Sequence, residues 1–248
     1  MRETLQNIWI VAKREFAGYF ATPIAAVFIV VFLVLAGALP IYAGDFFGRG
    51  EADLEPFFAF LPWLYLLLAP AIAMRLWAEE MRSGTAELLF TLPIGPGTAV
   101  LAKFLAGWAV MALALALTFP MWLTVAWLGD PDHRVIAAGY GGSLLVAGLY
   151  LAVASAASAV TRNQVVAFIL GVALCLIVTI PGAPALAGLL GDRLPAGIAE
   201  ALAVFGVLPH FRPIARGVID LRDLVFFATV TAFFLFAASV ALGLRRAG

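Results

Sequence analysis

Long apolar runs are the feature that most restricts the folds open to this chain. A helix needs about 20 mostly apolar residues to cross the hydrocarbon core of a bilayer. Six stretches of the sequence come close to that length or exceed it. A helix also satisfies its own backbone hydrogen bonds in lipid. The sequence therefore predicts one all-α membrane domain over 1–248, with six transmembrane helices at 23–43, 57–77, 98–128, 135–160, 164–180 and 223–244.

Composition agrees with a polytopic membrane protein. Apolar residues make up 64% of the chain and charged residues only 12%, with a mean hydropathy of +1.06. A soluble domain has about 25% charged residues. The net charge of zero gives no reason to expect a nucleic acid as a partner. The single cysteine, Cys175, excludes a disulfide within the chain and argues against a thiolate metal site.

Prolines predict where the apolar helices begin, bend and end. Pro23 suits the first position of the first span, where a missing N–H costs nothing. Pro62 and Pro70 predict a bent second span, and Pro120 predicts a kink in the third. Pro181, which a glycine follows, is expected to end the fifth span.

Lysine and arginine in short loops mark the cytoplasmic side of a membrane protein. Six spans place both termini on one side, and that side collects most of the basic residues. The two short loops on the other side contain only Arg49 and Arg134, among six acidic residues. We therefore expect both termini in the cytoplasm, on the side of Arg2, Lys13, Arg14, Arg75, Arg82, Lys103, Arg162, Arg245 and Arg246.

Residues 1–22 predict an amphipathic helix that lies in the cytoplasmic interface. Its polar residues include Lys13 and Arg14, and we expect Trp9 and Tyr19 at headgroup depth. A signal peptide is the competing interpretation. It fails because the charged region is too long and the following apolar run has spanning length. The apolar stripe of the helix is Leu5, Ile8, Ala12, Phe16 and Tyr19.

Residues 181–222 are a long connector on the outer side, apolar but broken by glycine and proline. We expect short re-entrant helices that dip back into the membrane between spans five and six. The alternative is a surface loop folded over the helix bundle.

Residues 79–92 are the longest charged, helix-like segment of the chain, between spans two and three. Apolar residues at helical spacing form one side, and most charges lie off that side. A cytoplasmic helix of this kind is suited to bind a partner protein, and a solvated loop helix with no partner is the alternative. The stripe is Met81, Thr85, Leu88 and Leu92, and the charges are Glu79, Glu80, Arg82 and Glu87.

The interiors of the predicted spans carry almost no ionisable residue, because Arg75 and Lys103 lie at span ends. A charge at mid-membrane costs roughly 2.5–3.5 kcal/mol, so a protein keeps one there only for a function. This pattern argues against a proton-coupled transporter. It also argues against an ion channel with a charged filter.

Signatures of catalysis are missing as well. Ser143 follows two glycines, but no histidine lies in a span to act as its base, so we interpret 141–143 as a helix-packing site. His133 lies beside charged loop residues and is expected to be solvated. A phosphate-binding loop needs Gly-Lys, whereas Lys13 and Lys103 each follow an alanine. We therefore expect no catalytic residue, no metal ligand and no cofactor in this chain.

Two motifs carry a resemblance to a known family. The end of span two reads Met-Arg-x-x-x-Glu-Glu-x-Arg-x-Gly-Thr-x-Glu-x-Leu, and residues 161–164 read Thr-Arg-Asn-Gln. With the six-span topology, they resemble the type-2 ABC transporter permeases, in particular the gliding-motility (GldF-like) branch. The first motif is filled here by Met74, Arg75, Glu79, Glu80, Arg82, Gly84, Thr85, Glu87 and Leu89.

The resemblance implies the permease subunit of an ATP-driven exporter in the bacterial inner membrane. Two permease chains, identical or different, would pair through spans one and five to form the translocation pathway. ATP and Mg would bind a separate cytoplasmic ATPase subunit, which docks on 79–92 as a coupling helix. The coupling residues would be Glu79, Glu80, Met81, Arg82, Ser83, Gly84, Thr85, Glu87, Leu88 and Leu89, with a second contact at Lys13, Arg14 and Phe16.

Two other classes of function remain open on the sequence. A non-transporting scaffold or assembly factor could recruit a cytoplasmic partner through 79–92. An intramembrane hydrolase would need a nucleophile paired with a base, which this sequence does not offer. The substrate of a transporter is also open, because the aromatic cluster at the outer end of span two suits an amphiphilic cargo and a lipid-facing belt equally.

Overall fold

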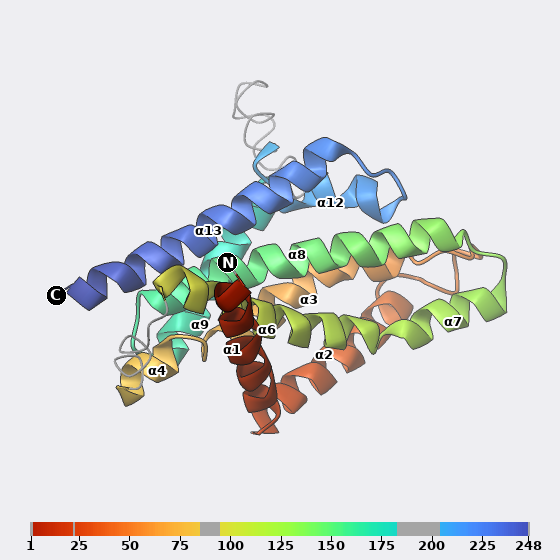
Figure 1. Ribbon diagram of the computed structural model, residues 1–248. Helices are drawn as coiled ribbons and strands as arrows, with labels where there is room; N and C mark the ends of the chain where they lie inside the picture. The colour runs from red at the N-terminus through yellow and green to blue at the C-terminus, as the bar shows by residue number, and fades with distance from the viewer. Residues whose placement is uncertain (1, 22, 85–94, 183–203, 248) are drawn as a thin grey trace.

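The computed structural model of the chain describes residues 2–21, 23–84, 95–182 and 204–247, and every regular element within them is helical (Figure 1). The predicted all-α fold is therefore confirmed. The elements are α1 (Arg2–Phe20), α2 (Pro23–Tyr42), α3 (Glu55–Ala73), α4 (Ala78–Ser83), α6 (Pro96–Ala116), α7 (Phe119–Leu128), α8 (His133–Ala159), α9 (Gln164–Thr179), the 3₁₀ turn η1 (Ile180–Gly182), α12 (Val207–Ala215) and α13 (Leu221–Ala247).

Five segments of the described chain are long and apolar enough to cross a membrane. They are α2, α3 with α4, α6 with α7, α8, and α13, which match five of the predicted spans. The remaining prediction, 164–180, coincides with α9, an apolar helix of 16 residues. Because α9 is shorter than the other five, the predicted span at 164–180 stays a prediction.

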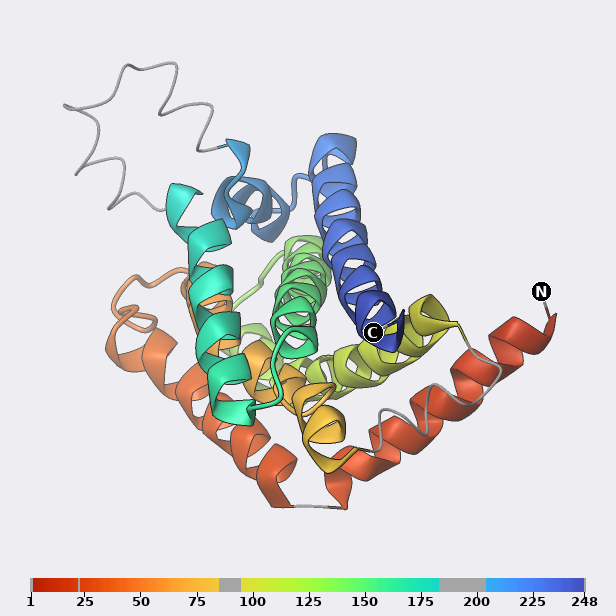
Figure 2. The ribbon, with the colours of Figure 1, turned by 90° about the vertical axis from the view of Figure 1, so that its left-hand side faces the viewer.

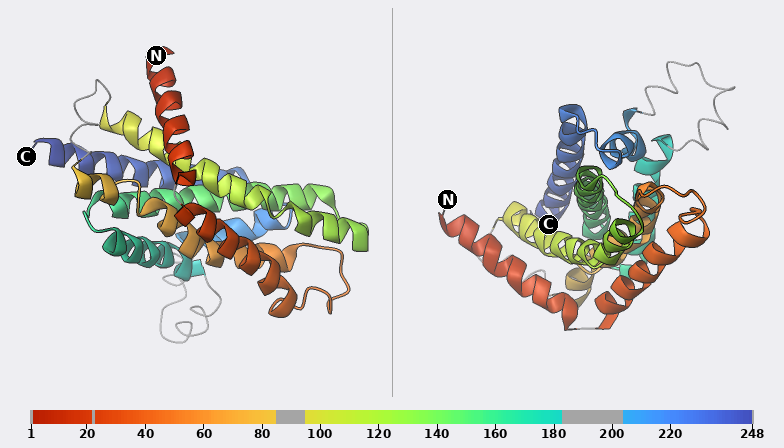
Figure 3. Two further views of the ribbon diagram at one scale, coloured as in Figure 1. Left: turned by 90° about the horizontal axis from the view of Figure 1, so that it is seen from below. Right: turned by 90° about the vertical axis from the view of Figure 1, so that its right-hand side faces the viewer.

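Helix α8 is the centre of the bundle and packs against α3, α6, α9, α12 and α13 (Figures 2 and 3). Small residues let its neighbours approach closely. A Cβ added at Gly142 would lie 2.7 Å from Ile214 of α12, and one at Gly148 would lie 3.1 Å from Trp108 of α6. Ser143 donates to the Gly139 carbonyl at 2.7 Å. The packing interpretation of 141–143 is thus confirmed for Gly142 and Ser143, whereas Gly141 is exposed.

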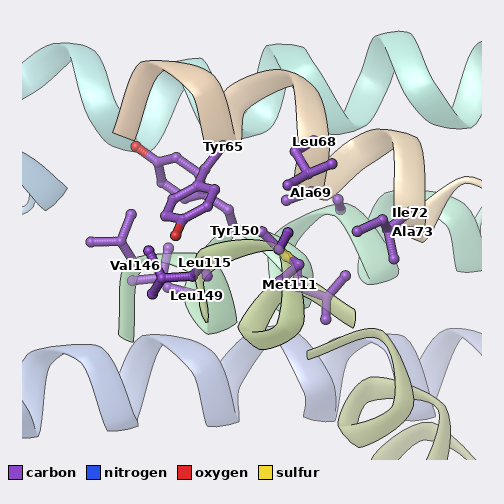
Figure 4. Packing of buried hydrophobic residues seen from close by; sticks show 14 of the residues in the cluster. Tyr65, Leu68, Ala69, Ile72, Ala73, Met111, Leu115, Val146, Leu149 and Tyr150 are labelled. Carbon is purple, nitrogen blue, oxygen red and sulfur yellow. The ribbon is translucent and has the colours of Figure 1, made fainter. Parts of the chain in front are cut away.

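The core lies where α3, α6 and α8 meet, as Figure 4 shows. Tyr65 and Ile72 from α3 meet Met111 from α6 and Leu149 from α8, and all four are at most 3% exposed. Lipid tails are as apolar as leucine, so burial from water cannot drive this contact between membrane helices. Close packing of complementary side chains holds the core together instead.

The kink predicted at Pro120 is a break between two helices. Helix α6 ends at Ala116 and α7 begins at Phe119, with Pro120 in its first turn. A proline ring clashes with the carbonyl four residues earlier, and that residue is Ala116. Pro62 and Pro70 do not break their helix, because α3 continues through both positions. The bend predicted there stays a prediction. Pro23 begins α2 as predicted.

Side-chain caps fix two helix starts. Asp132 Oδ1 accepts from the Arg134 and Val135 amides at 2.9 and 3.4 Å, so α8 begins two residues before the predicted boundary. Asn163 Oδ1 accepts from the amides of Val165 and Val166 at 2.9 and 3.4 Å at the start of α9. The 161–164 motif is therefore, physically, a helix cap.

The bundle has two distinct ends (Figure 1). We call the first the α4 end, where α4 lies with the start of α9 and the C-terminus of α13. The opposite α7 end holds the end of α7, the start of α8 and the connector between α2 and α3. Helix α1 lies at a steep angle to the long helices of the bundle, and its N-terminal part projects beyond them (Figure 3).

The apolar stripe of α1 faces the bundle. Ala12 and Tyr19 are buried, Phe16 packs against the core, and Trp9 is 71% exposed. The expectation that Tyr19 sits at headgroup depth stays a prediction. Tyr19 is nevertheless buried in the bundle, where its hydroxyl donates to the Ile72 carbonyl of α3 at 3.4 Å, while α1 as a whole packs mainly on α6.

The predicted outer segment 181–222 is described in part, since 183–203 lies outside the described residues. Its helix α12 packs on α8 and buries His210, which touches Asp223 at 2.7 Å and the Val204 carbonyl at 2.8 Å. That this segment dips into a membrane stays a prediction. His133, the other histidine, is exposed as expected and accepts from Trp122 Nε1 at 3.0 Å.

Candidate functional site: a buried lysine at the α4 end

A buried ammonium joins three segments at the α4 end. Lys103 lies in the second turn of α6 and is only 1% exposed. Its Nζ lies 2.9 Å from Glu15 Oε2 of α1 and 2.7 Å from Glu80 Oε1 of α4. The same atom lies 5.3 Å from the centroid of the Trp77 ring, within cation–π range. We call Lys103, Glu15 and Glu80 the Lys103 cluster.

The position of Glu15 follows from helix periodicity. It lies three residues after Ala12 and four before Tyr19, so all three share the face of α1 that packs on α6. A buried ammonium costs several kcal/mol unless it is paired and hydrogen-bonded. Glu15 and Glu80 supply that compensation from two other elements. The cluster therefore makes the seating of α1 and α4 depend on one side chain of α6.

Electrostatics at Glu15 reflect the same contact. Burial by itself would raise the pKa of this carboxyl group, but the Lys103 ammonium, together with Arg14, more than offsets it. The net effect lowers the pKa of Glu15 below its usual value. Glu15 is thus held as a carboxylate, the form that the buried ammonium requires.

Two serines of α8 hold the start of α4. Ser158 Oγ accepts from the backbone amides of Trp77 and Ala78 at 3.3 and 3.1 Å. Ser155 Oγ accepts from Trp77 Nε1 at 3.2 Å. The two serines are three residues apart and so lie on one face of α8. They anchor α4 to the central helix of the bundle.

The C-terminal part of α13 adds a clamp on α4. Arg245 donates to the Val160 carbonyl at 2.6 Å and reaches Met81 Sδ at 3.1 Å. Arg75, just before α4, forms an ion pair with Glu79 at 2.8 Å. Helix α4 is therefore tied to α6, α8 and α13 through side chains.

Helix α4 ends in a left-handed glycine. Gly84 has φ +74°, a conformation in which an L side chain is strained, and it caps α4 directly after Ser83. Ser83 donates to the Glu79 carbonyl at 2.9 Å, and Arg82 is exposed. The described part of the predicted coupling helix 79–92 is thus a short, anchored helix with a defined end.

The predicted coupling residues divide into four groups. Arg82, Ser83 and Gly84 are exposed, and Glu79 and Met81 are half-buried. Glu80 points inward to Lys103, an internal partner that the sequence did not predict. Thr85, Glu87, Leu88 and Leu89 lie outside the described residues.

The second predicted contact lies on α1. Lys13 and Arg14 are exposed, Arg14 pairs with Glu15 at 3.1 Å, and Phe16 packs inward. A cavity of about 220 Å³ separates α1 from α4. Its walls include Tyr19 and Arg75, so it is polar. The two predicted contact regions are therefore neighbours at one end of the molecule.

Sequence reasoning missed Lys103, Glu15 and the two serines. Lys103 was interpreted as one more basic residue at a span end. The available signal was that Glu15 is the one carboxylate within the apolar face of α1, which a buried position tolerates only opposite a cation.

Within the described ranges, no group of three or more His, Cys, Asp or Glu side chains is arranged to hold a metal ion. Compared with known proteins, the sequence matches no protein-family model and no curated protein.

Proposed function

We propose that this chain is the permease subunit of an ATP-driven ABC exporter and that a separate cytoplasmic ATPase, which binds ATP and Mg, drives it. The observation that carries the proposal is the Lys103 cluster. It fixes α1 and α4, which hold the two predicted ATPase contacts, to the start of α6. A force applied to either surface helix would reach a membrane helix through short, buried contacts.

Coupling would act through rigid movement of these elements. Trp77 and Ala78 tie α4 to α8, and Arg245 ties it to the end of α13. Packed interfaces of this kind move as units rather than deforming continuously. A displacement of α4 would therefore tilt the central helix of the bundle relative to its neighbours, which is the motion a translocation pathway needs.

We assign the docking role to the coupling segment 79–92. Arg82, Glu79 and Glu87 would meet charges on the ATPase. Thr85, Leu88 and Leu89 would extend the contact. Met81, Ser83 and Gly84 would shape the contact, and Glu80 would position α4 from inside. Lys13 and Arg14 on α1 would form the second contact, with Phe16 beneath them.

A second permease chain would pair with this one through α2 and α9. Both helices present aliphatic side chains that are about half exposed or more, Val30 and Val34 on α2 and Ile169 and Ile177 on α9. Gly171 of α9 is used within the chain, because an added Cβ would lie 3.1 Å from Pro70. The pairing contact would therefore be aliphatic.

We further propose six spans in the bacterial inner membrane, with α9 as the fifth in order and both termini in the cytoplasm. The 16 residues of α9 span roughly 24 Å, slightly less than the hydrocarbon core. Local thinning of the bilayer or tilting of neighbouring helices accommodates such a mismatch at modest cost. The basic residues at the α4 end support the orientation.

Charge reversal of the coupling segment tests the proposal. The chain is purified from its native membrane in mild detergent, and co-purifying proteins are identified by mass spectrometry. We expect the wild type to bring down a soluble protein with a phosphate-binding loop. The double variant Arg82→Glu, Glu87→Lys should lose it while remaining in the membrane.

The matched control reverses an exposed arginine at the other end, Arg134→Glu, and should retain the ATPase. Equal recovery of the ATPase with the double variant would refute the docking site. Absence of any nucleotide-binding protein from the wild-type preparation would favour the scaffold alternative.

A further inference from the structure

An apolar groove lies at the α7 end, far from the Lys103 cluster. Residues of α8, α12 and α13 line it. Helices α12 and α13 lie on the same side of α8 (Figures 1 and 2). The groove has a volume of about 590 Å³. Its lining includes Ala138, Gly141 and Leu145 from α8, Ile219 from the connector and Leu224 from α13. Arg134, near the start of α8, lies at one end of the groove.

Adjacent glycines define where the groove is closed and where it is open. A Cβ added at Gly142 would clash with Ile214, so α12 rests directly on α8 there. A Cβ at Gly141 would meet nothing within 4 Å, and this residue is exposed. The groove is therefore an open channel beside a tight contact, and a larger side chain at 141 would fill it without disturbing the packing.

The length of the groove matches one leaflet of a bilayer. Arg134 and Leu145 are separated by eleven helical residues, which span roughly 16 Å at 1.5 Å per residue. Half of the hydrocarbon core of a membrane is about 15 Å thick. An acyl chain that enters at the arginine would thus be covered over its whole depth.

Charge at the rim selects the headgroup. Within the described residues, Arg134 makes no ion pair, whereas Arg49 and Arg216 at the same end are both bound by Glu55. The carboxylate closest in sequence, Asp132, caps backbone amides of α8. A guanidinium is well matched to a phosphate, with which it forms paired hydrogen bonds.

We propose that this groove binds one acyl chain of an anionic phospholipid, with the lipid phosphate on Arg134. Its apolar walls offer no hydrogen-bond partner to a polar occupant, so an acyl chain fits them and a peptide backbone does not. The site is independent of the proposed ATPase docking, since it lies at the opposite end of the bundle.

Native mass spectrometry of the delipidated full chain tests the site. Dioleoyl phosphatidylglycerol and dioleoyl phosphatidylcholine are titrated separately, because they share acyl chains and differ in net charge. We expect one tightly bound lipid, with phosphatidylglycerol preferred. Arg134→Gln should weaken phosphatidylglycerol about tenfold, the effect of losing a charge-assisted contact, and weaken phosphatidylcholine less, because its choline cation offsets the phosphate charge.

Substitutions that fill the groove test the contact with the acyl chain separately from the contact with the headgroup. Gly141→Leu should abolish the tight binding of both lipids, and Ala137→Phe, at a second lining position, should do the same. Gly243→Leu is the matched control, because a Cβ there also meets nothing within 4 Å but lies in α13 at the α4 end. Arg222→Gln controls for the loss of one exposed arginine.

Three results would overturn the proposal. Wild-type binding by both filled variants, with the elution profile of folded protein, would place the lipid elsewhere. Equal binding of glycerol 3-phosphate, which has no acyl chain, would make the site a phosphate site. A lipid-free dimer that Gly141→Leu dissociates would make the groove a protein interface.

Discussion

Two buried tyrosines of the core differ in what their hydroxyl groups contact. Tyr65 of α3 stacks on Phe32 and is fully buried, yet its hydroxyl has no hydrogen-bond partner within the described residues. Tyr150 of α8 is also fully buried, but its hydroxyl bonds to that of Thr179. A buried polar group without a partner costs about 1–3 kcal/mol. The two hydroxyls should therefore contribute to stability with opposite signs.

Removing each hydroxyl tests this difference. Tyr65→Phe should raise the free energy of unfolding or leave it unchanged, because no hydrogen bond is lost. Tyr150→Phe should lower it by about 1 kcal/mol and leave Thr179 without that partner. The thermal unfolding midpoint in one detergent measures both. Equal destabilisation by the two substitutions would show that the Tyr65 hydroxyl has a partner.

At the scale of elements, the seating of α1 on the bundle rests on Lys103. Lys103→Met should free α1, because it removes the buried ammonium that Glu15 of α1 and Glu80 of α4 share. Breaking a buried ion pair in this way costs about 3–5 kcal/mol. Limited proteolysis within α1 measures the release. Arg14→Met, which removes an exposed partner of Glu15, should change the cleavage rate little. Unchanged cleavage in Lys103→Met would contradict the role of the cluster.

The same contact predicts a pH dependence. The pKa of Glu15 is lower in the folded chain than the ordinary value of 4.5, so its contribution is fully present above pH 4.5. That contribution is lost as the pH falls through the lowered value. Cleavage in α1 should therefore stay constant from neutral pH down to about 4.5 and rise only below it. Glu15→Gln should remove this step, and a step near pH 6 would be inconsistent with it.

Helix boundaries could be predicted from the sequence where local chemistry sets them. Pro23 and the break before Pro120 follow from the geometry of proline alone. The contacts of Lys103 could not be predicted, because Glu15 and Lys103 are 88 residues apart and only tertiary packing brings them together. The contact of Tyr19 with α3 could not be predicted either, since an interfacial and a bundle-facing stripe have the same periodicity.

The whole molecule has a charge asymmetry that predicts its orientation. The α4 end carries Arg82 and Lys13, which we expect in the cytoplasm, and the α7 end carries Arg49, Arg134 and Arg216 with several carboxylates, among them Glu51 and Glu55. Five of the six predicted spans correspond to helices of sufficient length. The sequence could not show whether 164–180 spans the membrane, because apolar character alone does not distinguish a short span from a buried helix.

Cysteine labelling of intact cells measures this orientation. Cys175, the one cysteine in the chain, is fully buried, so single exposed cysteines can be introduced and labelled selectively. Arg49→Cys and Asp130→Cys should react with a membrane-impermeant maleimide added outside. Arg82→Cys and Lys13→Cys should react only after the cells are opened. Labelling of position 82 from outside would reverse the topology.

A photo-crosslinking residue at position 82 tests most directly whether this chain couples a membrane bundle to an ATPase. A benzophenone amino acid replaces Arg82 in living cells, and Arg49 in a parallel strain as the control. We expect irradiation to attach a protein with a phosphate-binding loop at position 82 and not at position 49. An adduct at 82 to a protein without a nucleotide site, or no adduct in a correctly inserted chain, would contradict the proposed coupling.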